Sequence, residues 1–298
     1  MKDQAHSLRR LVTKRNNTFS IKVFSVTSGK GGVGKTSIVV NIAIMLAALG
    51  KKVLILDADL GLANIDVILG LTPKYNIRHV LEGKCSIEDV LLDGPGGIKI
   101  IPASSGIQEL VDISYEQQIS LANALDYFDR EMDYMLIDTG AGISRNVMYF
   151  NMAAQGIIVV ITPEPTSITD AYALMKVLRR KHGIKRFNLI INNVSSIMEG
   201  EDVAEKLSFV CEQFLGDVAL NMLGSLPFDK HIPECVRGQK AFVWVYPKGI
   251  TTQRLRSIVK KLDSISNLLD ENGNIQFFLR RMLLEQMGGM NNAGHGIS

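Results

Sequence analysis

Short apolar, β-branched runs alternate with longer helical stretches along most of the chain. The seven clearest runs are IKVFSVT (21–27), VLILD (53–57), IKII (98–101), YMLID (134–138), GIIVVIT (156–162), FNLIIN (187–192) and VALNMLGSLP (218–227). Runs that are apolar throughout indicate strands buried on both faces. Because they alternate with helices, they predict βαβ units in one α/β domain, with a mostly parallel, twisted sheet of about seven or eight strands flanked by helices.

The clearest helix is predicted over 35–50, KTSIVVNIAIMLAALG, where Gly50 is well placed just past the helix end. Residues 1–20 are polar and predict an extended or loosely helical arm. The composition turns polar again over 264–274, which indicates a linker. We therefore expect a domain at 21–264, followed at 265–298 by the linker, an amphipathic segment (275–287) and a disordered Gly/Asn-rich tail.

The composition is that of a soluble globular protein, with 21% charged and 46% apolar residues in 298. A net charge of +3 is low for a dominant nucleic-acid-binding surface. No apolar run reaches the roughly 18 residues that a spanning helix needs, and the polar N-terminus does not resemble a secretory signal. Cys85, Cys211 and Cys235 lie far apart, which indicates reduced thiols rather than a zinc or iron–sulfur site.

The sequence GKGGVGKT at 29–36 is a phosphate-binding loop, because it follows a predicted strand and begins a predicted helix. Its glycines allow a tight turn and close approach of the backbone to an anion. Lys35 supplies the charge for the β- and γ-phosphates of ATP, and Thr36 supplies a hydroxyl for Mg²⁺. The predicted nucleotide contacts are Gly29, Lys30, Gly31, Gly32, Val33, Gly34, Lys35, Thr36 and Ser37.

Acidic residues end two further predicted strands. YMLID ends at Asp138, which is typical of a Walker B aspartate that holds Mg²⁺. The following TGAGIS (139–144) resembles a switch II loop. VLILDADLG carries Asp57 and Asp59, at the strand end where open α/β sheets bind ligands.

Lys30 stands five residues before Lys35, and this early lysine resembles the deviant Walker A motif of the MinD/ParA family of ATPases. The resemblance covers about residues 21–260. It implies a homodimer formed on ATP, in which Lys30 reaches the phosphates of the partner subunit as an arginine finger would. It also implies that Thr36, Asp59 and Asp138 form the Mg²⁺ site and that Asp59 positions the attacking water, with Asp57 as a metal or structural neighbour.

The same resemblance implies contacts to adenine. Family members use an asparagine at the end of the strand FNLIIN for the adenine amino group, which would be Asn192 here. Asn193 is the alternative if the strand is shifted by one residue. GSLPFD (224–229) matches a late strand of the family whose loop lines the base, and it adds Pro227 and Asp229 to the predicted contacts.

The N-terminal DQAHSLR resembles the DQAxxLR segment of FlhG (FleN) proteins within that family. In those proteins it activates the GTPase of FlhF, a signal-recognition-type GTPase that places flagella. The resemblance implies that Gln4 enters the active site of such a partner, with Leu8 and Arg9 as docking contacts. The predicted partner segment comprises Asp3, Gln4, Ala5, Leu8 and Arg9. The alternative is a polar terminus with no function.

Residues 275–287 form the second terminal feature. Ile275, Phe278, Leu279, Met282 and Leu283 share one helical face, with Arg280 and Arg281 off it. This pattern is typical of an interfacial helix on anionic lipid, and dimerisation would double the anchor. MinD and FlhG proteins use a C-terminal helix in this way. The alternative is a helix packed on the protein, with release on dimerisation as a compatible variant.

The sequence thus predicts a cytoplasmic ATPase, slow and dependent on an activator, that attaches reversibly to the inner membrane and controls flagellar number and placement. Flagellar switch proteins or a flagellar transcription regulator are further implied partners. A MinD-type ATPase for division-site placement and a ParA-type DNA partition ATPase are the alternatives. A basic cluster at 177–188 would suit DNA, but it is more typical of a solvated helix end, so direct DNA binding is not expected.

Overall fold

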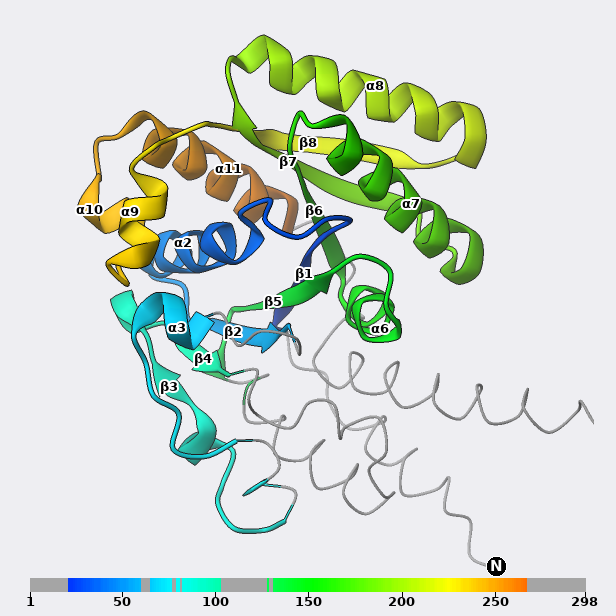
Figure 1. Ribbon diagram of the computed structural model, residues 1–298. Helices are drawn as coiled ribbons and strands as arrows, with labels where there is room; N and C mark the ends of the chain where they lie inside the picture. The colour runs from blue at the N-terminus through cyan, green and yellow to red at the C-terminus, as the bar shows by residue number, and fades with distance from the viewer. Residues whose placement is uncertain are drawn as a thin grey trace, which may run out of the picture.

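A central eight-stranded sheet organises the chain, of which the computed structural model describes residues 21–59, 65–76, 79–80, 82–102, 128 and 131–266 (Figure 1). The strand order is β3-β4-β2-β5-β1-β6-β7-β8, and every neighbouring pair is parallel except β3–β4. The strands are β1 (Lys22–Ser28), β2 (Val53–Ala58), β3 (Leu92–Asp93), β4 (Lys99–Ile101), β5 (Tyr134–Ala141), β6 (Gly156–Ile161), β7 (Arg186–Val194) and β8 (Ala219–Pro227). The predicted parallel α/β sheet is confirmed.

Helices cover both faces of this sheet (Figure 1). One apolar core lies between the sheet and the side that carries α2, α9, α10 and α11, and another lies between the sheet and α6, α7 and α8. The helices are α2 (Lys35–Ala48), α3 (Ile65–Leu69), α6 (Arg145–Ala153), α7 (Pro165–His182), α8 (Ile197–Leu215), α9 (Ile232–Arg237), α10 (Phe242–Val245) and α11 (Ile250–Ser266).

Several boundaries differ from those that the sequence predicts. β5 continues to Ala141, so the first residues of the predicted switch II loop belong to the strand. α11 extends to Ser266, two residues into the predicted linker, because its apolar positions continue in phase to Leu262 and Ile265. The two-residue strand β3 pairs antiparallel with β4, and two residues are too few to produce a periodic signal.

The helix after the phosphate loop ends as its sequence predicts. α2 ends at Ala48, and Gly50 adopts a left-handed conformation with φ +80°. Its N–H donates to the carbonyl of Ala47. Glycine enters this region without the steric penalty that a Cβ brings, so it stops the helix and turns the chain toward β2.

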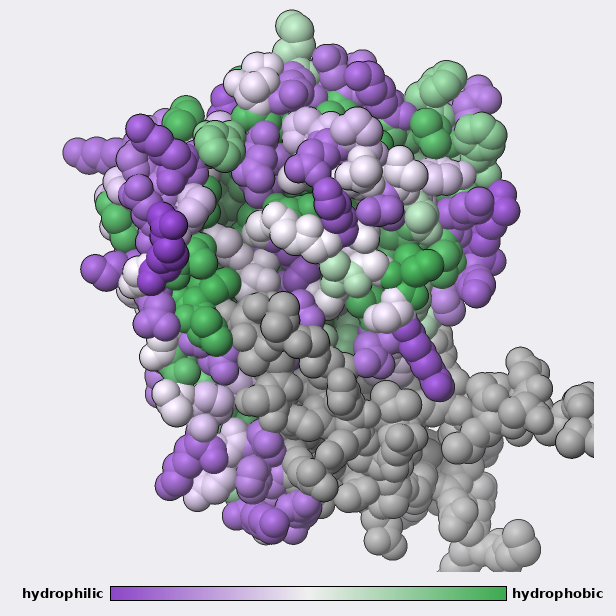
Figure 2. All heavy atoms as spheres, viewed as in Figure 1, coloured by the Kyte–Doolittle hydropathy of each residue, from purple (hydrophilic) through white to green (hydrophobic). Residues whose placement is uncertain are grey.

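Both terminal predictions fall outside the described residues: the arm at 1–20 and the segment at 275–287. Within the described part, no helix is long and apolar enough to cross a membrane. The face seen in Figure 2 carries hydrophilic side chains over most of the described surface, interrupted by smaller hydrophobic areas.

Candidate nucleotide-binding site

The predicted phosphate loop connects β1 to α2 at the carboxyl end of the central strands (Figure 1). Gly32 and Gly34 have φ of +79° and +86°, a region that L side chains rarely adopt. The first turn of α2 has neither an acidic residue nor a side-chain cap. Its backbone N–H groups and the positive end of its dipole are therefore arranged to receive an anion.

Gly29 fixes the loop against α7. A Cβ built on Gly29 would lie 2.2 Å from the carbonyl carbon of Asp170, a backbone atom of α7, so it fits only if the helix shifts. Gly31 in the same loop has nothing within 4 Å of its ideal Cβ. The first glycine is thus needed for packing of the loop on α7, whereas Gly31 leaves room above the loop.

Lys35 and Asp138 form a buried ion pair at the centre of the site. Nζ of Lys35 lies 2.5 Å from Oδ1 of Asp138, and the two side chains are 8% and 0% exposed. Burial raises the pKa of the Asp138 carboxyl, although Lys35 and the hydroxyl of Thr36 favour its charged form. The other carboxylate oxygen, Oδ2, is buried and accepts no hydrogen bond within the described residues.

Two acids after β2 have different surroundings. Asp57 is fully buried, and its carboxylate accepts the N–H groups of Asp59 and Ile65. It therefore ties the end of β2 to the start of α3. Asp59 points toward β5, since a Cβ on Gly140 would lie 3.4 Å from its Oδ1. The fold thus brings Asp59 close enough to Asp138 to interact with it electrostatically, and gives Asp57 a structural contact.

Asn192 lies directly behind the phosphate loop. Its Nδ2 donates to the carbonyl of Val33 over 2.8 Å, while its buried Oδ1 has no partner among the described residues. Asn193 is exposed, with φ +60°, so the two candidate asparagines occupy different environments. The site thus offers one buried amide oxygen that can only accept a hydrogen bond.

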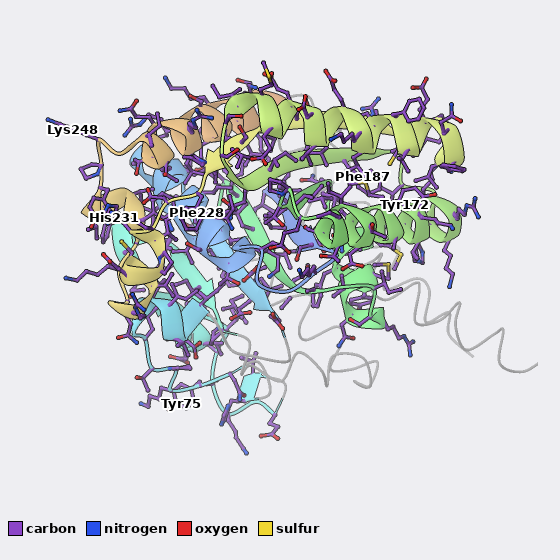
Figure 3. All side chains as sticks on the ribbon, turned by 45° about the horizontal axis from the view of Figure 1, so that its top comes forward. Tyr75, Tyr172, Phe187, Phe228, His231 and Lys248 are labelled. Carbon is purple, nitrogen blue, oxygen red and sulfur yellow. The ribbon has the colours of Figure 1, made fainter. Side chains whose placement is uncertain are left out.

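Pro227 is the last residue of β8, and Asp229 lies in the loop that follows it. Figure 3 shows Phe228 and His231 on the same connection to α9. Asp229 accepts hydrogen bonds from the hydroxyl of Thr251 and the N–H of His231. These bonds hold the loop to α11 and to the residue that precedes α9. Both carboxylate oxygens of Asp229 therefore already accept hydrogen bonds within the fold.

Lys30 makes a contact that the sequence does not predict. Its Nζ lies 2.5 Å from Oε2 of Glu164 and 3.2 Å from the hydroxyl of Thr166, at the start of α7. The Lys30 side chain is 40% exposed, in contrast to buried Lys35. Pro165 at the first helical position signals the start of α7, but neither Glu164 nor Thr166 belongs to a pattern that would mark it as part of the site.

The sequence does not predict a set of buried polar residues on the face of β1 that packs against α6. Asn151 of α6 accepts from Ser25 and donates to Thr27, both on β1. Thr139 of β5 donates to the carbonyl of Val26. These bonds join the strand before the phosphate loop to the strand and helix that flank the predicted switch II. The only indication in the sequence is that Ser25 and Thr27 alternate with apolar residues along β1.

The residues present fit a nucleotide with its metal ion. Mg²⁺ prefers hard oxygen donors, and the Asp138 carboxylate has one oxygen without a partner beside the Thr36 hydroxyl. The glycine-rich turn at the head of α2 fits a phosphate chain. Within the described residues, no cluster of three His, Cys, Asp or Glu side chains is placed to hold a metal ion.

Comparison with known proteins places this geometry in a family. The model for the AAA domain matches residues 21–191. The antiactivator FleN of Pseudomonas aeruginosa is 44% identical over 263 residues, which are 88% of this chain and 94% of that protein. The flagellum site-determining protein YlxH of Helicobacter pylori is 35% identical over 304 residues, covering 97% of this chain and all of that protein.

Among solved structures, the septum site-determining protein MinD complexed with Mg-ADP from Pyrococcus horikoshii aligns with a TM-score of 0.64. The sequences are 25% identical, and the alignment covers 84% of this chain and 99% of that one. The predicted architecture therefore agrees with that of a solved relative. The chain belongs to the MinD/ParA family of P-loop ATPases.

Proposed function

We propose that the chain is an ATP-driven dimerising switch that controls the number and placement of flagella. The contrast between the two lysines of its phosphate loop carries the proposal. Lys35 is buried against Asp138 inside its own subunit, whereas Lys30 lies at the surface and is 40% exposed. A lysine at the rim can reach a second subunit, which a buried one cannot.

In this proposal each residue of the site has a separate task. Lys35 would leave Asp138 for the phosphates of its own ATP, and Thr36 and Asp138 would hold Mg²⁺, whose charge would offset that of the phosphates. Asp59 orients the attacking water, and Lys30 of the partner subunit stabilises charge on the transferred group. Because catalysis here is positioning and charge stabilisation, turnover is slow until an activator completes the geometry.

The flagellar role follows from the relatives and the arm. Two relatives carry flagellar names, the antiactivator FleN and the site-determining protein YlxH. The arm with Gln4, Leu8 and Arg9 would stimulate an FlhF-type GTPase. The segment 275–287 would attach the ATP-bound dimer to anionic inner-membrane lipid, and hydrolysis would release it into the cytoplasm.

The basic cluster near the end of α7 does not favour a DNA-binding function. Asp217 forms ion pairs with Arg179 and Lys185. Lys185 and Arg179 together lower the pKa of Asp217 to about 2. Part of the positive charge is thus neutralised within the fold, which supports a solvated helix end.

Co-sedimentation with anionic vesicles tests the membrane-cycling class. We expect pelleting with ATP, little with ADP, and none after deletion of residues 275–298. The variant Asp59→Ala should bind ATP, dimerise persistently and remain on the vesicles. No pelleting in any nucleotide state would refute membrane cycling, and loss of ATP binding in Asp59→Ala would refute the role of that residue.

A GTPase assay separates this function from division-site placement. The synthetic peptide 1–20 should raise GTP hydrolysis by an FlhF-type GTPase, and the same peptide with Gln4→Ala should not. An inactive natural peptide would contradict the flagellar assignment while leaving the ATPase switch intact.

A further inference from the structure

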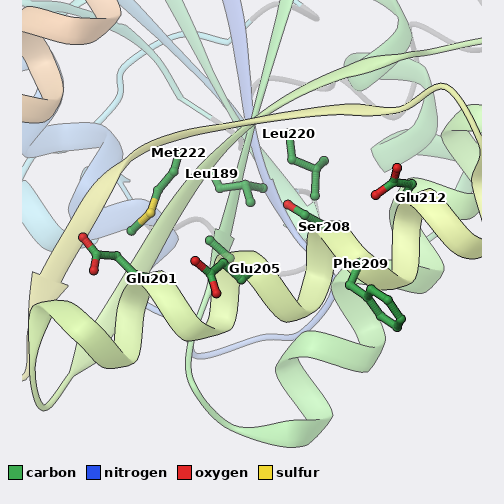
Figure 4. Close-up of a pocket in the computed structure, with 9 residues that line it drawn as sticks. Leu189, Glu201, Glu205, Ser208, Phe209, Glu212, Leu220 and Met222 are labelled. Carbon is green, nitrogen blue, oxygen red and sulfur yellow. The ribbon is translucent and has the colours of Figure 1, made fainter.

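A groove of about 430 Å³ lies between α8 and the adjacent strands, β7 and β8 (Figure 4). β8 is the last strand of the described sheet. Leu189, Leu220 and Met222 form the apolar side of the groove, and Phe209 of α8 is 64% exposed beside them. An exposed aromatic ring next to an apolar floor is typical of a surface that another segment covers.

The α8 side of the groove is acidic. Glu201, Glu205 and Glu212 line it together with Ser208 (Figure 4). Their spacing of four, three and four residues places all four on one helical face. Among the described residues, none of the three glutamates is in an ion pair. The groove therefore fits a helix with a basic stripe beside an apolar stripe.

The N-terminal arm has this pattern. In a helix, Arg10 and Lys14 share one face, and Leu8, Leu11 and Val12 lie on an adjacent one. Five basic side chains and a single acid, Asp3, occur in residues 1–20. The segment 275–287 has two arginines against Glu285, so charge complementarity favours the arm.

The arm also emerges close enough to reach the groove. The strand register places Leu220 beside Phe187, which lies level with Ser25 of β1. Ile21, where the arm leaves the sheet, lies four residues before Ser25, or about 13 Å before the level of Leu220. β1 and β8 are three strand spacings apart, about 15 Å. The diagonal of these two distances is about 20 Å, and the six residues from Arg15 to Ile21 extend to about 20–22 Å, which is just enough to reach the groove.

We propose that residues 1–20 dock as a helix in the α8–β8 groove of their own chain. Lys14 then lies nearest Glu212, and Arg10 lies near Glu205. The docking of the arm does not depend on the proposed function, but its regulatory consequence rests on it. Leu8 and Arg9 are covered when the arm is docked. A partner GTPase must therefore displace the arm from the groove before the arm can activate that GTPase.

Limited trypsin digestion of the full chain tests the docking. The triple variant E201Q/E205Q/E212Q removes the acidic row without adding a cleavage site. Three exposed ion pairs contribute a few-fold in equilibrium each at most, so cleavage after Arg9, Arg10 and Lys14 should become about tenfold faster. The control E88Q/D202N/E234Q changes the same charge at exposed positions outside the groove, and should leave cleavage of the arm unchanged.

The same digestion identifies other occupants. Equal cleavage of the arm in all three proteins would overturn the proposal. So would faster cleavage confined to Arg280 and Arg281, because the C-terminal segment would then be the occupant.

Carbodiimide coupling locates the arm directly. It joins lysine amines to carboxylates in contact, and we expect a Lys14–Glu212 product in the full chain, suppressed at high salt. A mixture of isotopically light and heavy chains distinguishes crosslinks within one chain from crosslinks between two chains. Products within one chain support the proposal, whereas products only between light and heavy chains would assign the groove to the arm of a second copy and overturn it.

Discussion

Nζ of Lys35 lies 2.5 Å from Oδ1 of Asp138, in a pair that has almost no exposed surface. Lys35, the predicted phosphate ligand, is thus paired with Asp138, the predicted metal ligand. ATP must compete with this pair for Lys35, and the carboxylate that it leaves behind then needs a cation. The geometry therefore couples binding of the nucleotide to binding of the metal ion.

The variant Lys35→Ala tests the strength of this pair. It leaves the Asp138 carboxylate buried without its partner, which lowers the free energy of unfolding by about 3 kcal/mol. Burial already raises the pKa of Asp138, and loss of Lys35 raises it further. A carboxyl with a raised pKa in the folded state loses stability as pH rises through that pKa, so the destabilisation should grow between pH 5 and pH 8.

Urea unfolding at both pH values measures this change. The double variant K35A/D138N has no carboxyl to titrate at this place, so its own free energy of unfolding should change less between pH 5 and pH 8 than that of Lys35→Ala. A destabilisation of Lys35→Ala that is the same at pH 5 and pH 8 would contradict the coupling.

The variant Gly29→Ala tests the packing of the loop on α7. Its Cβ would lie 2.2 Å from the backbone of Asp170, and overpacking of this kind lowers the free energy of unfolding by about 1–3 kcal/mol. Gly31→Ala is the matched control, because its Cβ meets nothing within 4 Å and its φ is not positive. Thermal unfolding should therefore separate the two, and a normal midpoint for Gly29→Ala would show that α7 can move away.

The variant Asp57→Asn tests the hydrogen bonds that join the end of β2 to the start of α3. An amide keeps only one accepting oxygen, so one of the N–H groups of Asp59 and Ile65 loses its acceptor. A buried unsatisfied donor costs about 1–3 kcal/mol, and Asp59 becomes less well positioned. The ATPase kcat should fall roughly tenfold, with ATP binding nearly unchanged.

Asp66→Asn is the control for that experiment. Asp66 accepts the N–H of its neighbour Val67, within α3 and away from Asp59. The two variants should differ in kcat. If Asp57→Asn weakened ATP binding and left kcat intact, Asp57 would act on the nucleotide rather than on Asp59.

The sequence predicts the fold and the phosphate loop well because both depend on local patterns. Continuous apolar runs indicate the parallel strands, and the order of glycines and lysines in 29–36 indicates the loop. The contacts of Lys30 with Glu164 and of Asn151 with Ser25 join residues more than 120 positions apart. No local pattern encodes such pairs. The short strand β3 is not predicted for a different reason: its two residues are too few to form a periodic pattern.

Selectivity between ATP and GTP tests which asparagine reads the base. The bond from Nδ2 of Asn192 to the carbonyl of Val33 fixes the orientation of the amide, which leaves its buried Oδ1 as an acceptor without a partner among the described residues. An acceptor suits the amino group of adenine and opposes the carbonyl oxygen of guanine. Asn192→Ala should therefore reduce the preference for ATP over GTP by about tenfold, equivalent to roughly 1.4 kcal/mol.

The ratio of the two dissociation constants is the decisive quantity. Loss of the bond to Val33 loosens the phosphate loop for ATP and GTP equally, so it cancels in the ratio, and only a contact with the base remains. Asn193→Gly is the control, since glycine tolerates the positive φ of that position, and it should keep the preference. The reverse result, in which Asn193→Gly alone loses selectivity, would assign the reading of the base to the exposed asparagine and leave Asn192 as a support for the loop.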